Sequence, residues 1–174
     1  LRFFTPNGGY QTYSFALTVG RWYHVTCTYD ASLSSNEKKI YLDGVLVSEQ
    51  TEGTDPDLDG LKLILGSYYS TSYGMEGNIA DVAVWNAALS GNMVTEIFNS
   101  GHPTDLSTNY GSYTKAGNLQ SWLNPNSASF DGTNWQIHDQ SGNSNSGSSV
   151  NMDGADYVNA SSSLDYPNIT PNTT

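Results

Sequence analysis

A dense group of carboxylates is the part of this sequence that comes nearest to acid–base chemistry. Its members are Glu49, Glu52, Asp55, Asp57 and Asp59. Glycoside hydrolysis needs two carboxyl groups held roughly 5–10 Å apart across a sugar. Gly53 and Pro56 interrupt the stretch, so it forms an irregular loop that fixes no such pair. Ser/His/Asp chemistry would need a nucleophile elbow, which the sequence lacks. We therefore expect no catalytic residues and no enzymatic activity.

A cluster of tyrosines is a candidate for ligand binding rather than catalysis. The segment SYYSTSYG at 67–74 carries Tyr68, Tyr69 and Tyr73 in a loop of small polar residues. Aromatic rings stack on the apolar C–H faces of sugars, so this loop is a candidate glycan site. A tyrosine-rich, weakly charged loop is equally suited to a protein–protein interface, or to packing over one end of the fold. The three tyrosines are thus predicted to bind a glycan or a protein.

Charge and cysteine content limit the partners. Lys and Arg number 6 against 17 Asp and Glu, which gives a formal net charge of -11. A chain without a basic stripe is not expected to bind nucleic acid. No apolar run reaches the ~18 residues of a membrane span, so membrane insertion is not expected. Cys27 is the single cysteine, which excludes a disulfide framework and a cysteine-ligated zinc site.

Several short alternating runs predict β-strands. In residues 22–30, Tyr23, Val25, Cys27 and Tyr29 fall on one face, which we expect to point inward. Residues 38–48 hold Asp-Gly between two β-prone runs, the pattern of a two-residue hairpin turn. Further strands are predicted at 61–65, 77–85, 119–123 and 135–139.

One short helix is predicted after these strands. Ser90 can cap its N-terminus and Gly101 is expected to close it. Met93 or Val94, together with Ile97 and Phe98, supplies an apolar stripe at helical spacing. Short strands separated by frequent turn signals indicate an antiparallel sandwich or barrel. The fold class predicted is therefore all-β, an antiparallel two-sheet sandwich with one short helix.

Four motifs in this order are similar to a known family. WYHVTCTYD, KIYLDGVLV, LKLILGS and MEGNIADVAVWNAALS resemble a LamG-like jelly-roll domain of the concanavalin A-like lectin/glucanase class, and the match is best over 21–101. The resemblance implies a jelly-roll sandwich over 1–158. Residues 159–174, rich in Asn, Ser and Thr, are expected to form a flexible tail. Residues 105–158 are similar to a segment of bacteriophage and marine virus proteins, and either close this sandwich or begin a second copy.

The resemblance also implies a calcium site. Many LamG-like domains hold calcium at the rim of the sandwich, and Asp81 matches the family's G-x-I-D position. Asp139 and Asn143 stand in a D-x-x-G-N turn, so these three residues are the predicted calcium ligands. The alternative is that Asp81 hydrogen-bonds the backbone at a strand edge and that Asp139 caps an Asx turn. Enzymes of the class use Glu-x-Asp-x-x-Glu, which is absent here.

These observations predict a non-enzymatic surface or adhesion module. The extended similarity to virus proteins favours part of a virion decoration, fibre or tail protein, with possible glycan binding. The alternative is a calcium-dependent carbohydrate-binding module of a secreted or cell-surface bacterial or algal adhesin. In both cases the expected location is extracellular, and the expected partners are a glycan or cell-surface receptor and other virion or surface subunits.

Overall fold

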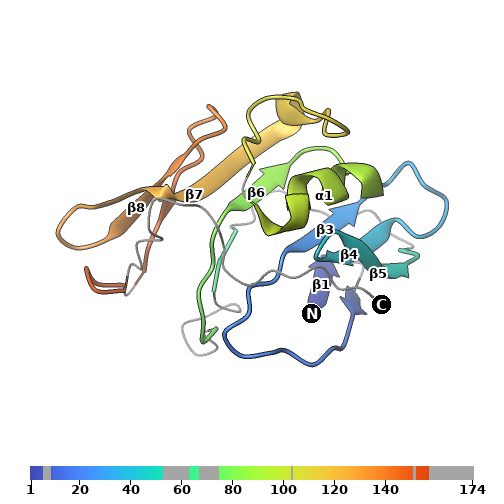
Figure 1. The fold of residues 1–174 in the computed structure, drawn as a ribbon, viewed down its shortest axis with the longest axis horizontal. Helices are drawn as coiled ribbons and strands as arrows, with labels where there is room; N and C mark the ends of the chain where they lie inside the picture. The colour runs from blue at the N-terminus through green and yellow to red at the C-terminus, as the bar shows by residue number, and fades with distance from the viewer. Residues whose placement is uncertain (6–8, 53–62, 67–74, 103, 151, 157–174) are drawn as a thin grey trace. The chain divides into compact units, whose positions relative to one another are not determined.

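The computed structural model describes residues 1–5, 9–52, 63–66, 75–102, 104–150 and 152–156. Within them, strands in antiparallel sheets dominate and a single α-helix is present (Figure 1), which confirms the predicted all-β class. None of the described helices is long and apolar enough to cross a membrane. The chain divides into two compact units. The first comprises Leu1–Asp57, Trp85–Leu119 and Ala160–Thr174, and the second comprises Leu58–Val84 and Gln120–Asn159.

The first unit contains a hairpin, a three-stranded sheet and the helix. The hairpin pairs β1 with β2, and the sheet has the order β3-β4-β5. Figure 1 shows helix α1 beside this sheet. Two short 3-10 turns, η1 and η2, follow the helix along the chain. The elements are β1 (Arg2–Thr5), β2 (Gly9–Thr12), β3 (Val25–Tyr29), β4 (Lys38–Leu42), β5 (Val45–Gln50), α1 (Gly91–Phe98), η1 (Asn99–Gly101) and η2 (Ala116–Asn118).

The predicted Asp-Gly hairpin is confirmed between β4 and β5. Asp43 and Gly44 both adopt positive φ, at 49° and 78°, as a two-residue hairpin turn requires. Gly44 also has a packing reason, because a Cβ placed there would lie 2.8 Å from a ring carbon of Phe98. The Thr95 hydroxyl donates to the Gly44 carbonyl at 3.0 Å. The turn therefore docks against α1 through a glycine that no larger residue can replace without strain.

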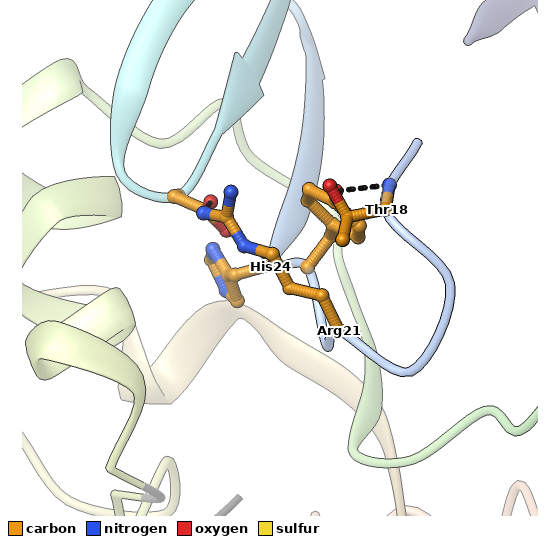
Figure 2. Close-up of polar contacts among 5 residues, drawn as sticks. Thr18, Arg21 and His24 are labelled. Atoms are coloured by element: carbon orange, nitrogen blue, oxygen red, sulfur yellow. Dashed lines mark hydrogen bonds and ion pairs between the residues drawn. The ribbon is translucent and has the colours of Figure 1, made fainter. Parts of the chain in front are cut away.

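Arg21 ties the segment before β3 to the same turn (Figure 2). Its guanidinium pairs with the Asp43 carboxylate at 2.6 Å, and the backbone N–H of His24 donates to the same carboxylate at 2.9 Å. The guanidinium also lies 4.6 Å from the ring centroid of Tyr23, whose hydroxyl accepts from the N–H of Thr18 at 2.9 Å. The Asp43 side chain is only 1% exposed. Its negative charge is thus balanced locally by a cation and a backbone donor.

Helix α1 begins at the predicted cap, but it is closed two residues before Gly101, the residue predicted to close it. The Ser90 hydroxyl accepts from the N–H of Met93, and Asn99 in the left-handed region closes the helix ahead of Gly101. Of the predicted stripe, the helix buries Val94 and Phe98, while Met93 and Ile97 are partly buried against the core. Val94 belongs to the small core of this unit, whose buried members are Tyr41, Leu89, Val94 and Tyr113.

The prediction that Val25 and Cys27 of β3 are enclosed is wrong. Val25 is 44% exposed and Cys27 is exposed, whereas Thr28 on the opposite face is buried. Although part of the Cys27 residue is open to solvent, protein atoms surround much of its thiol. The resulting loss of hydration raises the pKa of the thiol to about 11. The cause lies in the order of the strands, because β3 is an edge strand and the central strand β4 takes the burial, with Ile40 at 0% exposure.

The second unit centres on a four-stranded antiparallel sheet of order β6-β7-β8-β9. The strand predicted at 135–139 is confirmed, but the one predicted at 119–123 extends to residue 130. Residues 63–65 of the strand predicted at 61–65 are not in a strand, and all three side chains are exposed. The strands are β6 (Val82–Trp85), β7 (Leu119–Phe130), β8 (Trp135–Asp139) and β9 (Gly147–Ser148).

Candidate functional site

A hollow in the second unit brings together one indole, three carboxamides and a hydroxyl. Its volume is about 300 Å³. Four of the lining residues come from β7, and the fifth follows the last residue of β8. Indoles stack on sugar faces, and carboxamides both donate and accept hydrogen bonds, so this lining is suited to polyhydroxylated ligands. The lining residues are Trp122, Asn124, Asn126, Ser127 and Gln140.

An irregularity in β7 shapes the hollow. The pairing register between β7 and β8 shifts between Leu123 and Ala128, so the intervening residues leave the regular ladder. Asn124 holds this bulge, because its side-chain oxygen accepts from the N–H of Asn126 at 2.8 Å. The Ser127 hydroxyl lies 2.7 Å from the carbonyl oxygen of Asn124 and from that of His138. The backbone of the bulge and the side chains of Asn124 and Ser127 are therefore fixed by hydrogen bonds within β7 and with β8.

Asp81 orients one wall of the hollow. Its carboxylate accepts from the side-chain NH₂ of Asn124 at 2.8 Å. Asn124 is only 9% exposed, so the direction of its carboxamide is set by this bond and by the one to Asn126. Asp81 itself adopts a positive φ of 49°, a conformation that Asp tolerates better than most residues. A residue predicted as a calcium ligand thus positions a lining residue of the hollow.

Asp139 holds the backbone of Trp122. One carboxylate oxygen accepts from the N–H groups of Trp122 at 2.8 Å and Ser141 at 2.9 Å. The other accepts from the Ser141 hydroxyl at 2.8 Å and from the N–H of Asn145 at 2.9 Å. Burial by itself would raise the pKa of Asp139, but these donors outweigh it and the pKa is lowered. The bond to Ser141 is the Asx-turn geometry that the sequence offered as the alternative to calcium.

Asn143 belongs to the same turn. Its backbone N–H and its side-chain NH₂ approach the Ser141 hydroxyl at 3.3 and 3.1 Å. The structure therefore links Asp139 with Asn143 through Ser141, while Asp81 is linked to Asn124. A carboxylate has about four lone-pair sites, and the four donors on Asp139 occupy them, so this carboxylate as arranged does not fit a metal. Across the described residues, no group of three or more His, Cys, Asp or Glu could hold a metal ion. Calcium stays a prediction.

The structure describes the residues of the hollow but not the three candidate tyrosines. Tyr68, Tyr69 and Tyr73 lie outside the described residues, so their predicted role stays a prediction. The hollow, by contrast, was missed from the sequence. One signal was available, since Pro125 inside a strand pattern marks an edge or a bulge. Nothing local, however, indicated that Gln140 would face the same space as Trp122.

Comparison with known proteins places the fold in a family. Residues 1–95, more than half of the chain, match a laminin G family of the concanavalin A-like lectin/glucanases superfamily, and the chain belongs to that superfamily. This confirms the resemblance and the jelly-roll class implied by it. The hollow lies beyond the matched residues. No curated protein matches the chain significantly.

A solved structure shares the fold. It is the crystal structure of a protein from Bacteroides ovatus ATCC 8483 described as a "putative carbohydrate binding protein", with a TM-score of 0.60 and 22% sequence identity. The similarity covers 82% of this chain and 38% of that protein, so this chain corresponds to well under half of its length. At 22% identity, this similarity shows that the two proteins share a fold.

Proposed function

We propose that this chain is a non-enzymatic carbohydrate-binding module and that the hollow beside Trp122 is its sugar site. The observation that carries the proposal is the meeting of an indole with the carboxamides of Asn124, Asn126 and Gln140 around one hollow. Sugar rings present apolar C–H faces to an aromatic ring and pairs of hydroxyls to carboxamides. The superfamily and the description of the Bacteroides protein support the same class of ligand.

The lining of the hollow supports binding without catalysis. None of its described lining residues carries an ionisable side chain. Glycoside hydrolysis needs one carboxyl group to protonate the leaving oxygen and a second to act as nucleophile or base. The carboxylate of Asp139 accepts four hydrogen bonds within its own turn and with Trp122, which ties it to a positioning role.

A glycan array followed by calorimetric titration of the best hit tests the sugar site. We expect Trp122→Ala to weaken binding at least about tenfold, which corresponds to ~1.4 kcal/mol. Asn126→Ala, at an exposed lining position, should weaken it less. Trp135→Ala is the matched control, because Trp135 is a tryptophan of the same sheet that does not line the hollow. No glycan signal from the parent, or unchanged affinity in Trp122→Ala, contradicts the proposal.

The tyrosine-rich segment at 67–74 is the competing candidate for the binding site. We propose that it contributes contacts to a glycan or protein partner, as the sequence predicts. A Tyr68→Ala/Tyr69→Ala double variant separates it from the hollow. Loss of glycan binding in this variant, with retention in Trp122→Ala, would move the sugar site to residues 67–74.

A finer proposal is that the module is displayed outside a virus or phage particle, as part of a decoration, fibre or tail protein. The resemblance over 101–158 supports it, and a net charge of -11 would keep crowded copies soluble through mutual repulsion. The alternative is a secreted or cell-surface adhesin, calcium-dependent if the predicted ligands bind the ion. Mass spectrometry of purified particles is the test, and finding the chain only in medium or on cell envelopes overturns the virion proposal.

A further inference from the structure

Lys38 is a fully buried lysine of the first unit. It belongs to no part of the proposed sugar site, which is lined by residues of the second unit. Its side chain is 0% exposed and forms an ion pair with the carboxylate of Glu52. The ammonium also donates to the carbonyl of Gly9 at 2.9 Å and lies 5.5 Å from the ring centroid of Phe3. Removing two charges from water carries a penalty of several kcal/mol per ion in principle. A pair this deeply buried therefore calls for a reason beyond surface electrostatics.

The carboxylate side of the pair is equally enclosed. The Glu52 side chain is 5% exposed, and its Oε2 accepts from the Thr5 hydroxyl at 3.1 Å. A second buried carboxylate, that of Glu37, accepts from the backbone N–H of Glu52 at 2.9 Å. One amine and two carboxyl groups thus share a region closed to solvent, with Glu37 holding the backbone of the residue whose side chain meets the amine.

We propose that Lys38 and Glu52 are the partners of an intramolecular isopeptide bond. The ammonium passes one proton to the Glu52 carboxylate, and the freed lone pair on Nζ attacks Cδ. A C–N bond forms and one C–O bond breaks. The departing oxygen takes two protons, both originally on the ammonium, and leaves as water. One ammonium and one carboxylate become one amide and one water molecule, with no oxidant, reductant or other reactant.

The surroundings of the pair favour this condensation. The reacting groups are held in contact, which removes the entropy of bringing them together. The Thr5 hydroxyl donates to Glu52 Oε2, where negative charge develops as the nitrogen adds. The product amide is neutral, so both buried charges and their desolvation penalty disappear. Exclusion of water then protects the bond from hydrolysis.

The bond would join the start of β4 to the segment after β5, across the end of the hairpin opposite the Asp43-Gly44 turn. It concerns residues of the first unit only, so it stands or falls independently of the sugar site.

The intact mass of the denatured 174-residue chain is the decisive measurement. We expect it to be lower than the mass calculated from the sequence by one water molecule. Proteolysis and tandem mass spectrometry should then yield a branched peptide that joins residues 38 and 52. A mass equal to the calculated value overturns the proposal, as does a water loss that maps to any other pair.

Two lysine variants sharpen the test. Lys38→Arg keeps a cation in place, but the guanidinium stays protonated and cannot attack, so the full calculated mass should return. Lys39→Arg makes the same change at the next position, which is only half-buried and should keep the water loss. Because a misfolded Lys38→Arg would also show the full mass, the branched peptide of the parent decides. A water loss that survives in Lys38→Arg overturns the proposal.

Discussion

The two units differ in the partners of their hydrogen-bonded carboxylates. In the first unit, Glu52 meets the ammonium of Lys38 and Asp43 meets the guanidinium of Arg21. In the second unit, Asp81 and Asp139 accept from neutral carboxamide, hydroxyl and backbone donors. A buried pair of opposite charges depends on both partners being present, whereas a turn built on neutral donors loses hydrogen bonds one by one. Single substitutions should therefore have unequal effects in the two units.

The largest effect is expected from Lys38→Met. This change leaves the Glu52 carboxylate charged and buried, with neither an ammonium nor the proposed amide bond to neutralise it, and should lower the free energy of unfolding by about 3–5 kcal/mol. Urea denaturation followed by tryptophan fluorescence measures the loss. Lys39→Met is the matched control and should change stability by less than about 1 kcal/mol. Equal effects of the two substitutions would show that the full burial of Lys38 adds nothing to stability beyond that of the half-buried Lys39.

Asp139→Ala should have a smaller effect on stability, and it should also weaken glycan binding by the second unit. The change strips acceptors from the N–H groups of Trp122, Ser141 and Asn145, with an expected loss of about 1–3 kcal/mol. It also frees the backbone that positions Trp122, so glycan affinity should fall with stability. Asp139→Asn, which keeps one side-chain oxygen, should lose less of both. Intact glycan binding in a destabilised Asp139→Ala would separate the turn from the hollow.

His24 makes the stability of the first unit depend on pH. Burial lowers the pKa of its imidazole, partly opposed by the Asp43 carboxylate, and the ring lies 5.6 Å from that of Phe98. A lowered pKa means that the unfolded chain binds the proton more readily. Stability is therefore highest above the unfolded pKa of about 6.5, and falls as the pH drops below it toward the folded value. Melting temperatures of the parent and of His24→Gln between pH 7.5 and 5.0 should show a steeper fall in the parent. Parallel curves contradict this assignment.

The smallest effect is expected from calcium. Since four donors fill the Asp139 carboxylate, we expect added calcium or EDTA to leave the melting temperature unchanged. Binding to the folded state would instead raise it with calcium concentration. Such a rise, with heat in titration calorimetry and loss of both in Asp139→Asn, would establish the site predicted at Asp81, Asp139 and Asn143.

The sequence by itself determined the local elements. Asp43-Gly44, the Ser90 cap and the strand at 135–139 depend on φ preferences, capping hydroxyls and alternation, which neighbouring residues settle among themselves. The four family motifs likewise determined the jelly-roll class, because their order along the chain is a property of sequence alone.

Only the tertiary structure decided which residues are enclosed. Alternation in β3 placed Val25 and Cys27 on one face, and both are exposed at the sheet edge although their partners Leu42 and Ile40 in β4 are buried. Lys38 would be expected at the surface from its charge, and it is buried because Phe3 and Gly9 of the β1-β2 hairpin and the distant Glu52 close over it. The hollow arises in the same way, since Gln140 reaches the space beside Trp122 only through the pairing of β8 with β7. Burial depends on contacts between segments far apart in the chain, and local patterns carry no information about which segments will meet.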